Sequence, residues 1–296
     1  MLQGANVLVT GGGSGIGLAL GAAMAHQGAR IVLADIDAAA AQHGAEQVSS
    51  AGGTVSGMAL DVADRDAFAR SVDELVQTHG SIDYLVNCAG VSIGGSTHEL
   101  TGPHWDAVID VNLGGVANGV LAAYPHMVRA GRGHIVNIAS GAGLVPLPFV
   151  VAYSATKHAV VGLSLGLRPE AARHGVRVSV VCPGAVETPI LDRVPPSHLP
   201  LTPTEPVTPR AFLSVLGQTP IDADLFARAA VRRILKDQPL IIVPARLRTL
   251  WLLHRISPAL TQRLAGILVG KVQRDLLVET EAPATRAIDE GAAERA

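Results

Sequence analysis

The sequence predicts an α/β fold in which one doubly wound sheet of about seven parallel strands carries helices on both faces. Three observations predict it. Seven short β-rich runs recur along the chain, and they are continuously apolar, as in strands buried on both faces. Segments long enough for crossover helices separate the first six runs. The 296 residues are 48% apolar and 16% charged, which supports one large core.

The expected strands are residues 6–10, 30–35, 54–60, 83–87, 134–139, 176–181 and 240–243. This alternation of strands and helices fails at two places. Residues 189–220 hold too many prolines for a long helix, and an irregular segment of this length is typical of a functional lid. Beyond Pro244 the pattern predicts one or two amphipathic helices, followed by a frayed end from residue 279. We therefore expect a domain over residues 1–245 and a helical extension with a frayed tail over 246–296.

The composition of the chain limits the kinds of partner and cellular compartment that can be expected. The net charge of −2 and the 3% aromatic content argue against nucleic-acid binding. Cys88 and Cys182 lie far apart in apolar runs and are expected to be buried thiols in a reducing compartment, while the histidines show no metal-ligand spacing. No basic region precedes the first apolar run, and no 18 uncharged apolar residues occur together. A cytoplasmic protein is expected. The amphipathic pattern of the extension favours helices that pack on the domain or on a second subunit over helices that lie on a membrane surface.

The first strand leads directly into T-G-G-G-S-G-I-G, residues 10–17. Its spacing is T-G-x-x-x-G-x-G, with glycines at Gly11, Gly15 and Gly17. Glycines between a strand and a helix let backbone amides approach a pyrophosphate at the helix N-terminus. A purely structural strand–helix junction is the alternative, but the position within the first 20 residues favours a dinucleotide site.

Asp35 ends the second expected strand, 18 residues after Gly17. A carboxylate there would accept hydrogen bonds from an adenosine ribose and repel a 2′-phosphate. Ser14 and Ile36 are neutral, and Arg30 lies at the other end of the strand. This pattern predicts NAD over NADP, whereas Asp37 is better placed to cap the next helix.

Tyr153 and Lys157 are four residues apart in Y-S-A-T-K. In a helix such residues share a face, so the ammonium and the phenol would be neighbours. A nearby cation favours the phenolate and can lower the pKa of a phenol by roughly 1–3 units. A surface Tyr–Lys pair is the alternative reading of the motif taken alone.

Taken together, these motifs resemble the short-chain dehydrogenase/reductase family over residues 5 to about 245. The resemblance rests on T-G-G-G-S-G-I-G, Asp35, D-V at 61–62, N-C-A-G at 87–90, N-L-G-G at 112–115, Ser140, and Y-S-A-T-K followed by P-G-A-V-E-T. It implies a single Rossmann-type domain. The family usually has asparagine where this chain has Cys88. Pro169 is unexpected and should end or kink its helix near Arg168.

The resemblance also implies roles for individual residues. Ser140 would hydrogen-bond the substrate oxygen, Tyr153 would act as general base with Lys157 stabilising its phenolate, and Asn112 would hold a water that links Lys157 to solvent. Tyr153 and Lys157 would also contact the cofactor. The other expected cofactor-binding residues are Gly11, Ser14, Gly15, Ile16, Gly17, Asp35, Asp61, Val62, Asn87, Ala89, Gly90, Pro183, Gly184, Val186 and Thr188.

The predicted function is NAD-dependent interconversion of a secondary alcohol and a ketone. The apolar residues 141–151 and the proline-rich segment suggest an apolar substrate such as a steroid, terpenoid, aryl or long-chain alcohol. One alternative is an NADPH-dependent 3-oxoacyl-thioester reductase, and a more distant one is a catalytically silent NAD-sensing module. The small and apolar residues of 101–130 and 152–168, together with the resemblance, predict a homodimer or homotetramer.

Overall fold

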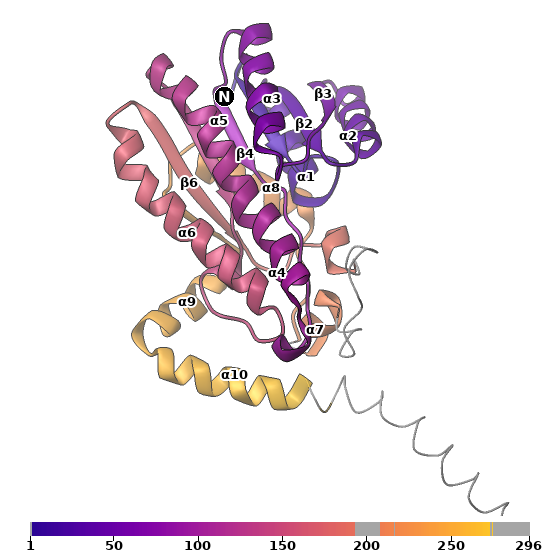
Figure 1. Ribbon diagram of the computed structural model, residues 1–296, viewed down its shortest axis with the longest axis vertical. Coiled ribbons are helices and arrows are strands. Elements are labelled where there is room, and N and C mark those ends of the chain that lie inside the picture. The colour runs from indigo at the N-terminus through magenta and orange to yellow at the C-terminus, as the bar shows by residue number, and fades with distance from the viewer. Residues whose placement is uncertain (1, 193–207, 216, 273, 275–296) are drawn as a thin grey trace, which may run out of the picture.

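The structure is a computed structural model and describes residues 2–192, 208–215, 217–272 and 274 (Figure 1). Within them, seven strands form one sheet in the order β3-β2-β1-β4-β5-β6-β7, and every neighbouring pair is parallel. The strands are β1 Asn6–Thr10, β2 Arg30–Asp35, β3 Thr54–Ala59, β4 Tyr84–Asn87, β5 Gly133–Ile138, β6 Val176–Pro183 and β7 Leu240–Val243. The predicted doubly wound parallel sheet is confirmed, and strand ends differ from the expected ones by at most two residues.

Helices cover both faces of the sheet. They are α1 Gly15–Ala25, α2 Ala38–Ser50, α3 Arg65–His79, α4 Gly102–Ile109, α5 Gly115–Ala130, α6 Val151–Ala172, α7 Pro209–Val215, α8 Ala223–Ile234, α9 Leu247–Ile256 and α10 Pro258–Val272. A π-helical turn, Asp110–Gly114, joins α4 to α5, and single 3₁₀ turns cover Thr97–Glu99, Gly141–Gly143 and Pro189–Leu191. Helices α1, α2 and α8 lie on one face of the sheet, and α3, α5 and α6 lie on the other (Figure 1).

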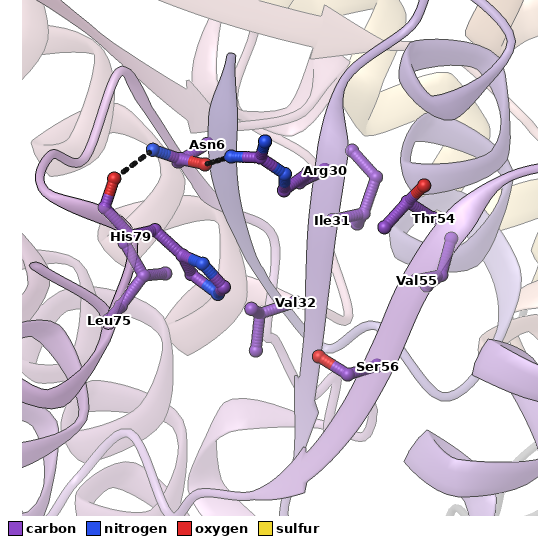
Figure 2. Close-up of a pocket in the computed structure, with 9 residues that line it drawn as sticks. All are labelled: Asn6, Arg30, Ile31, Val32, Thr54, Val55, Ser56, Leu75 and His79. Carbon is purple, nitrogen blue, oxygen red and sulfur yellow. Dashed lines mark hydrogen bonds between the residues drawn. The ribbon is translucent and has the colours of Figure 1, made fainter. Parts of the chain in front are cut away.

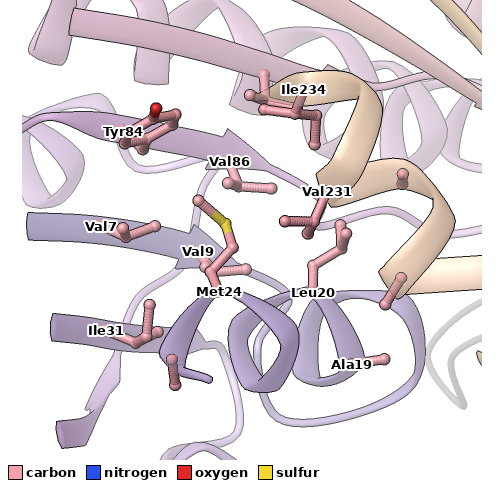
Figure 3. Close-up of a cluster of buried hydrophobic side chains, with 14 of the residues drawn as sticks. Val7, Val9, Ala19, Leu20, Met24, Ile31, Tyr84, Val86, Val231 and Ile234 are labelled. Carbon is pink, nitrogen blue, oxygen red and sulfur yellow. The ribbon is translucent and has the colours of Figure 1, made fainter. Parts of the chain in front are cut away.

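The two cores follow from the alternation of side chains along each strand. Val7 and Val9 of β1 point toward α1 and α8, where they pack with Leu20, Met24 and Val231 (Figure 3). Leu8, between them, points to the opposite face and packs under α3 and α5. Both faces of β1 are therefore dry, which explains why its sequence is a continuous apolar run.

The continuous helix from α4 through α5, Gly102–Ala130, is long and apolar enough to cross a membrane by length and composition. Its α5 part buries Val116, Ala123 and Met127 toward the sheet and the neighbouring helices. Its length and composition are thus those of a core helix in a layered domain.

The two segments that interrupt the predicted alternation have different outcomes. Residues 193–207 lie outside the described part of the chain, and beyond them α7 is a short helix of seven residues. The predicted amphipathic helices of the extension are confirmed as α9 and α10, which project as an arm at one end of the molecule (Figure 1). Residues 279–296, expected to fray, lie outside the described residues.

Pro169 does not end its helix, so the first of the two expected outcomes, an end or a kink near Arg168, is wrong. Helix α6 continues through Pro169 to Ala172. The arginine before it fixes this end of the helix, because Arg168 donates to the Val178 carbonyl and to both carboxylate oxygens of Asp237 at 2.9 Å. The missing proline N–H removes one helical bond near the C-terminus, and these tertiary bonds hold the last turn.

A hollow of about 200 Å³ lies at the amino ends of the first strands (Figure 2). Arg30 crosses it to donate to the Asn6 side chain at 3.2 Å, and Asn6 in turn donates to the His79 carbonyl. This hollow is at the edge of the sheet opposite the glycine-rich loop. It contains none of the residues that the sequence singled out.

Candidate active site

The glycine-rich loop joins β1 to α1 at the point where the strand order reverses between β1 and β4. Four of its glycines, Gly11, Gly12, Gly13 and Gly17, lie where an added Cβ would come within 3.0 Å of another atom. A Cβ on Gly11 would lie 2.8 Å from the Ala89 Cα, and one on Gly17 would lie 2.1 Å from the Gly11 carbonyl oxygen. Gly15 has φ +54°, a left-handed conformation that favours glycine, and its Cα faces Thr188 across the site.

The N-terminus of α1 opens onto this loop. Ser14 is the N-cap residue, but its side chain makes no capping hydrogen bond, and the first turn carries no acidic residue. The backbone N–H groups of this turn therefore remain without a side-chain acceptor, which is the arrangement that binds an anionic phosphate. These residues fit the pyrophosphate of a dinucleotide.

Thr10, which the sequence analysis left out of the site, ties the two halves of this crevice together. Its buried hydroxyl accepts hydrogen bonds from the N–H groups of Cys88 and Ala89, at 3.0 and 3.2 Å. It thus fixes the turn after β4 against the turn after β1. The threonine that opens T-G-x-x-x-G-x-G was the available signal.

Asp35 turns its carboxylate toward the same loop. One oxygen accepts from the Gly13 N–H at 3.0 Å and the other from the Asp37 N–H at 3.1 Å. Asp37, as predicted, caps α2 by accepting from Ala39 and Ala40. The residue after Asp35 is the neutral and exposed Ile36, and Arg30 lies at the far end of β2. Neither residue places a positive charge beside the Asp35 carboxylate.

Ser140 and Tyr153 meet through a hydrogen bond between their side chains. Ser140 follows β5 by two residues and also accepts from the Ala142 N–H at 3.1 Å, which holds the tight turn Gly141–Gly143. Tyr153 lies in the first turn of α6, against an apolar cluster that includes Ile93. The strand end and the helix start thus bring together the two hydroxyls that the sequence placed 13 residues apart.

Lys157 is buried one turn further along α6, as the i, i+4 spacing predicted. Its ammonium donates to the Ile138 carbonyl at 3.0 Å and lies 5.6 Å from the centre of the Tyr153 ring. Burial lowers the pKa of Lys157 to about 8. The ammonium therefore sits beside the phenol ring and remains mostly protonated at neutral pH.

The expectation of a lowered pKa for Tyr153 is not met in this structure. Burial raises the pKa of the Tyr153 phenol, and the hydrogen bond with Ser140 only partly offsets that effect. The i, i+4 spacing places a cation near the phenol but does not reveal the loss of solvent around the ring. Desolvation disfavours the charged phenolate more than the Ser140 hydrogen bond favours it.

Asn112 lies fully buried in the π-helical turn between α4 and α5. Its side chain accepts from the Val91 N–H at 2.8 Å and donates to the Val91 carbonyl at 2.9 Å, with a longer bond to Thr156. It therefore holds the segment after Gly90 in place. The expected role in holding a water stays a prediction.

The remaining predicted cofactor residues fall into two groups. Asp61, Ala89, Gly90, Pro183, Gly184 and Thr188 lie at or just beyond the carboxyl ends of parallel strands, on the same edge of the sheet as the glycine loop, where Ser14 and Ile16 flank Gly15. A Cβ on Gly90 would lie 3.4 Å from the Lys157 ammonium, so this backbone borders the cluster of Ser140, Tyr153 and Lys157. Val62, Asn87 and Val186 have buried side chains, as do Pro183 and Thr188 of the first group.

Asn87 illustrates the second group. Its amide nitrogen donates to Asn137 at 2.8 Å, and Asn137 donates to Ser164 on α6 at 2.9 Å. The Asn87 oxygen is buried without a hydrogen-bond partner among the described residues. The asparagine side chain thus belongs to a polar chain inside the sheet layer.

Leu247, the first residue of α9, was also missed. Its side chain packs on the turn that follows Ser140, where a Cβ on Gly141 would come within 2.9 Å of it. The contact joins residues more than a hundred positions apart, so no local pattern could predict it. The extension therefore packs against the turn that follows Ser140.

Comparison with known proteins identifies the family that this site resembles. A family model described as short chain dehydrogenase matches residues 5–198. The chain is 38% identical over 180 residues to 2-(S)-hydroxypropyl-CoM dehydrogenase 3 of Xanthobacter autotrophicus, covering 61% of this chain and 71% of that one. It is 36% identical over 194 residues to the 3-oxoacyl-[acyl-carrier-protein] reductase FabG of Thermotoga maritima, covering 66% and 79%.

Solved structures agree with this. A short chain dehydrogenase/reductase from Burkholderia phymatum in complex with NAD has a TM-score of 0.81 at 30% identity, covering 88% of this chain and 96% of that one. A metagenomic short-chain oxidoreductase in complex with NADP has a TM-score of 0.65 at 31% identity, covering 81% and 97%. Structural neighbours of this chain thus bind either nucleotide.

Proposed function

The chain belongs to the short-chain dehydrogenase family of oxidoreductases, and from this premise we propose that it interconverts a secondary alcohol and a ketone with NAD. The observation that carries the proposal is the hydrogen-bonded Ser140–Tyr153 pair beside the buried Lys157 ammonium. This cluster borders the glycine-rich crevice through Gly90. A proton-transfer group and a dinucleotide cradle are thus within reach of one substrate.

The proposed chemistry divides between three side chains. Ser140 donates a hydrogen bond to the substrate oxygen and orients the carbinol carbon. Tyr153 removes the hydroxyl proton, and the Lys157 ammonium stabilises the phenolate that forms. A nicotinamide bound in the crevice would accept the hydrogen of the carbinol carbon as hydride. In the reverse direction Tyr153 returns its proton to the carbonyl oxygen.

The raised pKa of Tyr153 is compatible with this role. A phenol that is neutral at rest is ready to protonate a ketone, and for alcohol oxidation it must lose its proton. The positive charge on Lys157, together with the Ser140 hydrogen bond, lowers the cost of that loss. Oxidation is therefore expected to accelerate with rising pH until Lys157, whose pKa is about 8, begins to lose its charge.

Asp35 supports the choice of NAD. Its carboxylate is held at the mouth of the glycine loop by the Gly13 and Asp37 N–H groups, and it retains lone pairs for two ribose hydroxyls. A 2′-phosphate would meet this negative charge beside the exposed, neutral Ile36.

The surroundings of Tyr153 support an apolar substrate. Ile93, Val108 and Ala152 form a buried cluster against which Trp105 and Tyr153 pack. Not all of the apolar residues 141–151 can line a substrate pocket, because Leu144 and Val145 belong to the domain core. The apolar wall that a substrate would contact is therefore the one around Tyr153.

The experiment is a panel of steroid, terpenoid, aryl and long-chain secondary alcohols, assayed with NAD and with NADP by the absorbance of the reduced cofactor. We expect NAD to give the higher kcat/KM. Asp35→Ala should reduce kcat/KM with NAD by about ten- to a hundredfold and raise it with NADP, because it removes a ribose acceptor and a repulsive charge. Asp66→Ala, an exposed carboxylate in the first turn of α3, is the matched control. A wild type that prefers NADP would refute the argument from Asp35.

The similarity to FabG of Thermotoga maritima favours one second candidate, an NADPH-dependent reductase of 3-oxoacyl thioesters. Assaying NADPH oxidation with a 3-oxoacyl thioester distinguishes the two. Activity confined to that pair would replace the first proposal. Dinucleotide binding without turnover of any substrate class would instead support a silent sensing module.

A further inference from the structure

The extension concentrates positive charge. Residues 245–274 contain six of the chain's 23 Lys and Arg residues and none of its 25 Asp and Glu residues. These cations are Arg246, Arg248, Arg255, Arg263, Lys271 and Arg274. None of them forms an ion pair within the described part of the chain. Within a chain whose net charge is −2, residues 245–274 thus form a basic segment that the other described residues do not neutralise.

The same arm exposes large apolar side chains. On α10, Leu260, Leu264 and Ile267 recur at helical spacing and are exposed, with Ile267 at 69%. Arg263 lies between them in sequence and is exposed as well. On α9, Ile256 is 82% exposed at the end that joins α10. Apolar and cationic side chains therefore share one solvent-facing surface.

This surface is separate from the face that holds the arm to the protein. Leu247 and Trp251 of α9 pack against a buried apolar cluster that includes Leu144 and Ile242, while Thr261 and Val272 of α10 are buried. Lys271 also donates to the Val215 carbonyl of α7 at 2.9 Å. The arm is anchored by these contacts, and the exposed leucines and isoleucines are not needed for the anchoring.

We propose that the α9–α10 arm docks on the surface of an anionic lipid bilayer. Large apolar side chains interspersed with Arg and Lys are the composition of a helix that lies in the headgroup region. A second copy of this arm is the less suitable occupant, because two arms would bring twelve cations together without one carboxylate from residues 245–274. A lipid surface supplies the missing negative charge and accepts the apolar side chains.

The test is co-sedimentation of the full chain with two kinds of vesicle. One kind is phosphatidylcholine alone, and the other contains about 30% phosphatidylglycerol, which gives the vesicle a negative surface potential. We expect binding to the anionic vesicles, little binding to phosphatidylcholine, and loss of binding as salt is raised. Equal binding to both vesicles, or binding to neither, would overturn the proposal.

Two variants separate the apolar and the electrostatic contributions. Leu264→Ser with Ile267→Ser should reduce the vesicle partition coefficient by about tenfold or more, because two apolar side chains that would be buried in the bilayer are lost. Arg263→Gln with Arg274→Gln, two exposed cations outside the anchoring contacts, should reduce it by about tenfold, because each cation near an anionic surface contributes a several-fold factor. Leu225→Ser, an equally exposed leucine on α8, is the matched control and should bind like the wild type.

Light scattering without lipid identifies the rival occupant. The Leu264→Ser, Ile267→Ser protein should keep the wild-type mass and its dehydrogenase activity toward a soluble alcohol. A fall in mass together with no vesicle binding by the wild type would show that a second copy covers this face, and would overturn the proposal.

Discussion

His134 is a buried histidine whose hydrogen bonds specify its neutral form. The Ser179 hydroxyl donates to the Gln238 carbonyl at 2.7 Å, so it accepts from the His134 Nε2–H at 2.9 Å. The other ring nitrogen, Nδ1, is buried without a partner among the described residues. Burial, with the nearby Arg177 charge, lowers the pKa of His134 to about 3.

This pKa predicts acid destabilisation. The unfolded chain binds a proton at His134 below pH 6.5, whereas the native protein does not bind it until about pH 3. The free energy of unfolding should therefore fall by about 1.4 kcal/mol per pH unit as pH drops through this window. Urea unfolding of the wild type and His134→Gln at pH 7.5 and pH 5.5 measures it.

In His134→Gln the fall between the two pH values should be smaller by about 1 kcal/mol, although the variant is less stable at pH 7.5 because its packing changes. His43→Gln, an exposed histidine on α2, should behave like the wild type. Equal pH dependence in His134→Gln and the wild type would show that the native protein already accommodates the proton.

At the scale of elements, α7 is held to the segment after β6 by one arginine. Arg210 donates to Glu187 and to Asp192, at 3.1 and 2.6 Å for two of these contacts. Glu187 lies between Val186 and Thr188, two of the predicted cofactor residues. The hydrogen bonds with Asp192 and Glu187 raise the pKa of the Arg210 guanidinium, and those from Arg210 lower the pKa of both carboxyl groups.

Arg210→Gln should loosen this clamp. All three side chains are exposed, so the effect should be modest: about a two- to fivefold rise in KM for substrate or cofactor, with kcat nearly unchanged. The rise should shrink at 0.5 M salt, about where exposed ion pairs are screened in the wild type as well. Arg232→Gln, an exposed arginine on α8, is the control. An unchanged KM at low salt would show that α7 is positioned without the ion pairs.

The sequence predicted elements best where one local pattern determines them. Apolar runs located the strands, although β3, T-V-S-G-M-A at the edge of the sheet, is not buried on both faces as expected. The Asp37 cap follows from its position before α2. The expected helix end at Pro169 was wrong because the bonds of Arg168 to Val178 and Asp237 come from other parts of the chain.

The site was predictable as a set of motifs but not as an environment. The spacing placed Gly11 and Gly15 at a strand–helix junction and Tyr153 and Lys157 on one helix, and the fold brings both to one edge of the sheet. The raised pKa of Tyr153 depends on burial, and the Leu247 contact depends on the extension folding back on the domain. Both are consequences of tertiary packing, which residue spacing does not contain.

For the whole molecule, the predicted homodimer has a surface to form on. Leu121 of α5 is 58% exposed, and Leu165 of α6 is exposed between Gly162 and Gly166. A Cβ added to either of these glycines would meet nothing within 4 Å, so this face is open to close approach by another helix. We propose that two copies pack through α5 and α6.

Light scattering at micromolar concentration tests this assembly. The wild type should have at least twice the 30.5 kDa mass of one chain. Leu121→Arg with Leu165→Arg should be monomeric, because it buries unpaired charge at the interface, while Leu225→Arg on α8 should assemble normally. A wild-type mass of one chain would refute the proposed dimer without bearing on the membrane arm.

If this fold assembles an alcohol–ketone oxidoreductase around Tyr153, the Tyr153→Phe variant should lose the reaction while keeping the cofactor. The variant keeps the ring and its packing but removes the proton-transfer group. We predict that kcat/KM falls by about 10²- to 10⁴-fold on the best alcohol while the dissociation constant for NAD, measured by calorimetry, changes little. Tyr124→Phe, a half-buried tyrosine on α5, should retain activity. If Tyr153→Phe kept most of the wild-type kcat/KM with unchanged NAD binding, the proposed mechanism would be contradicted.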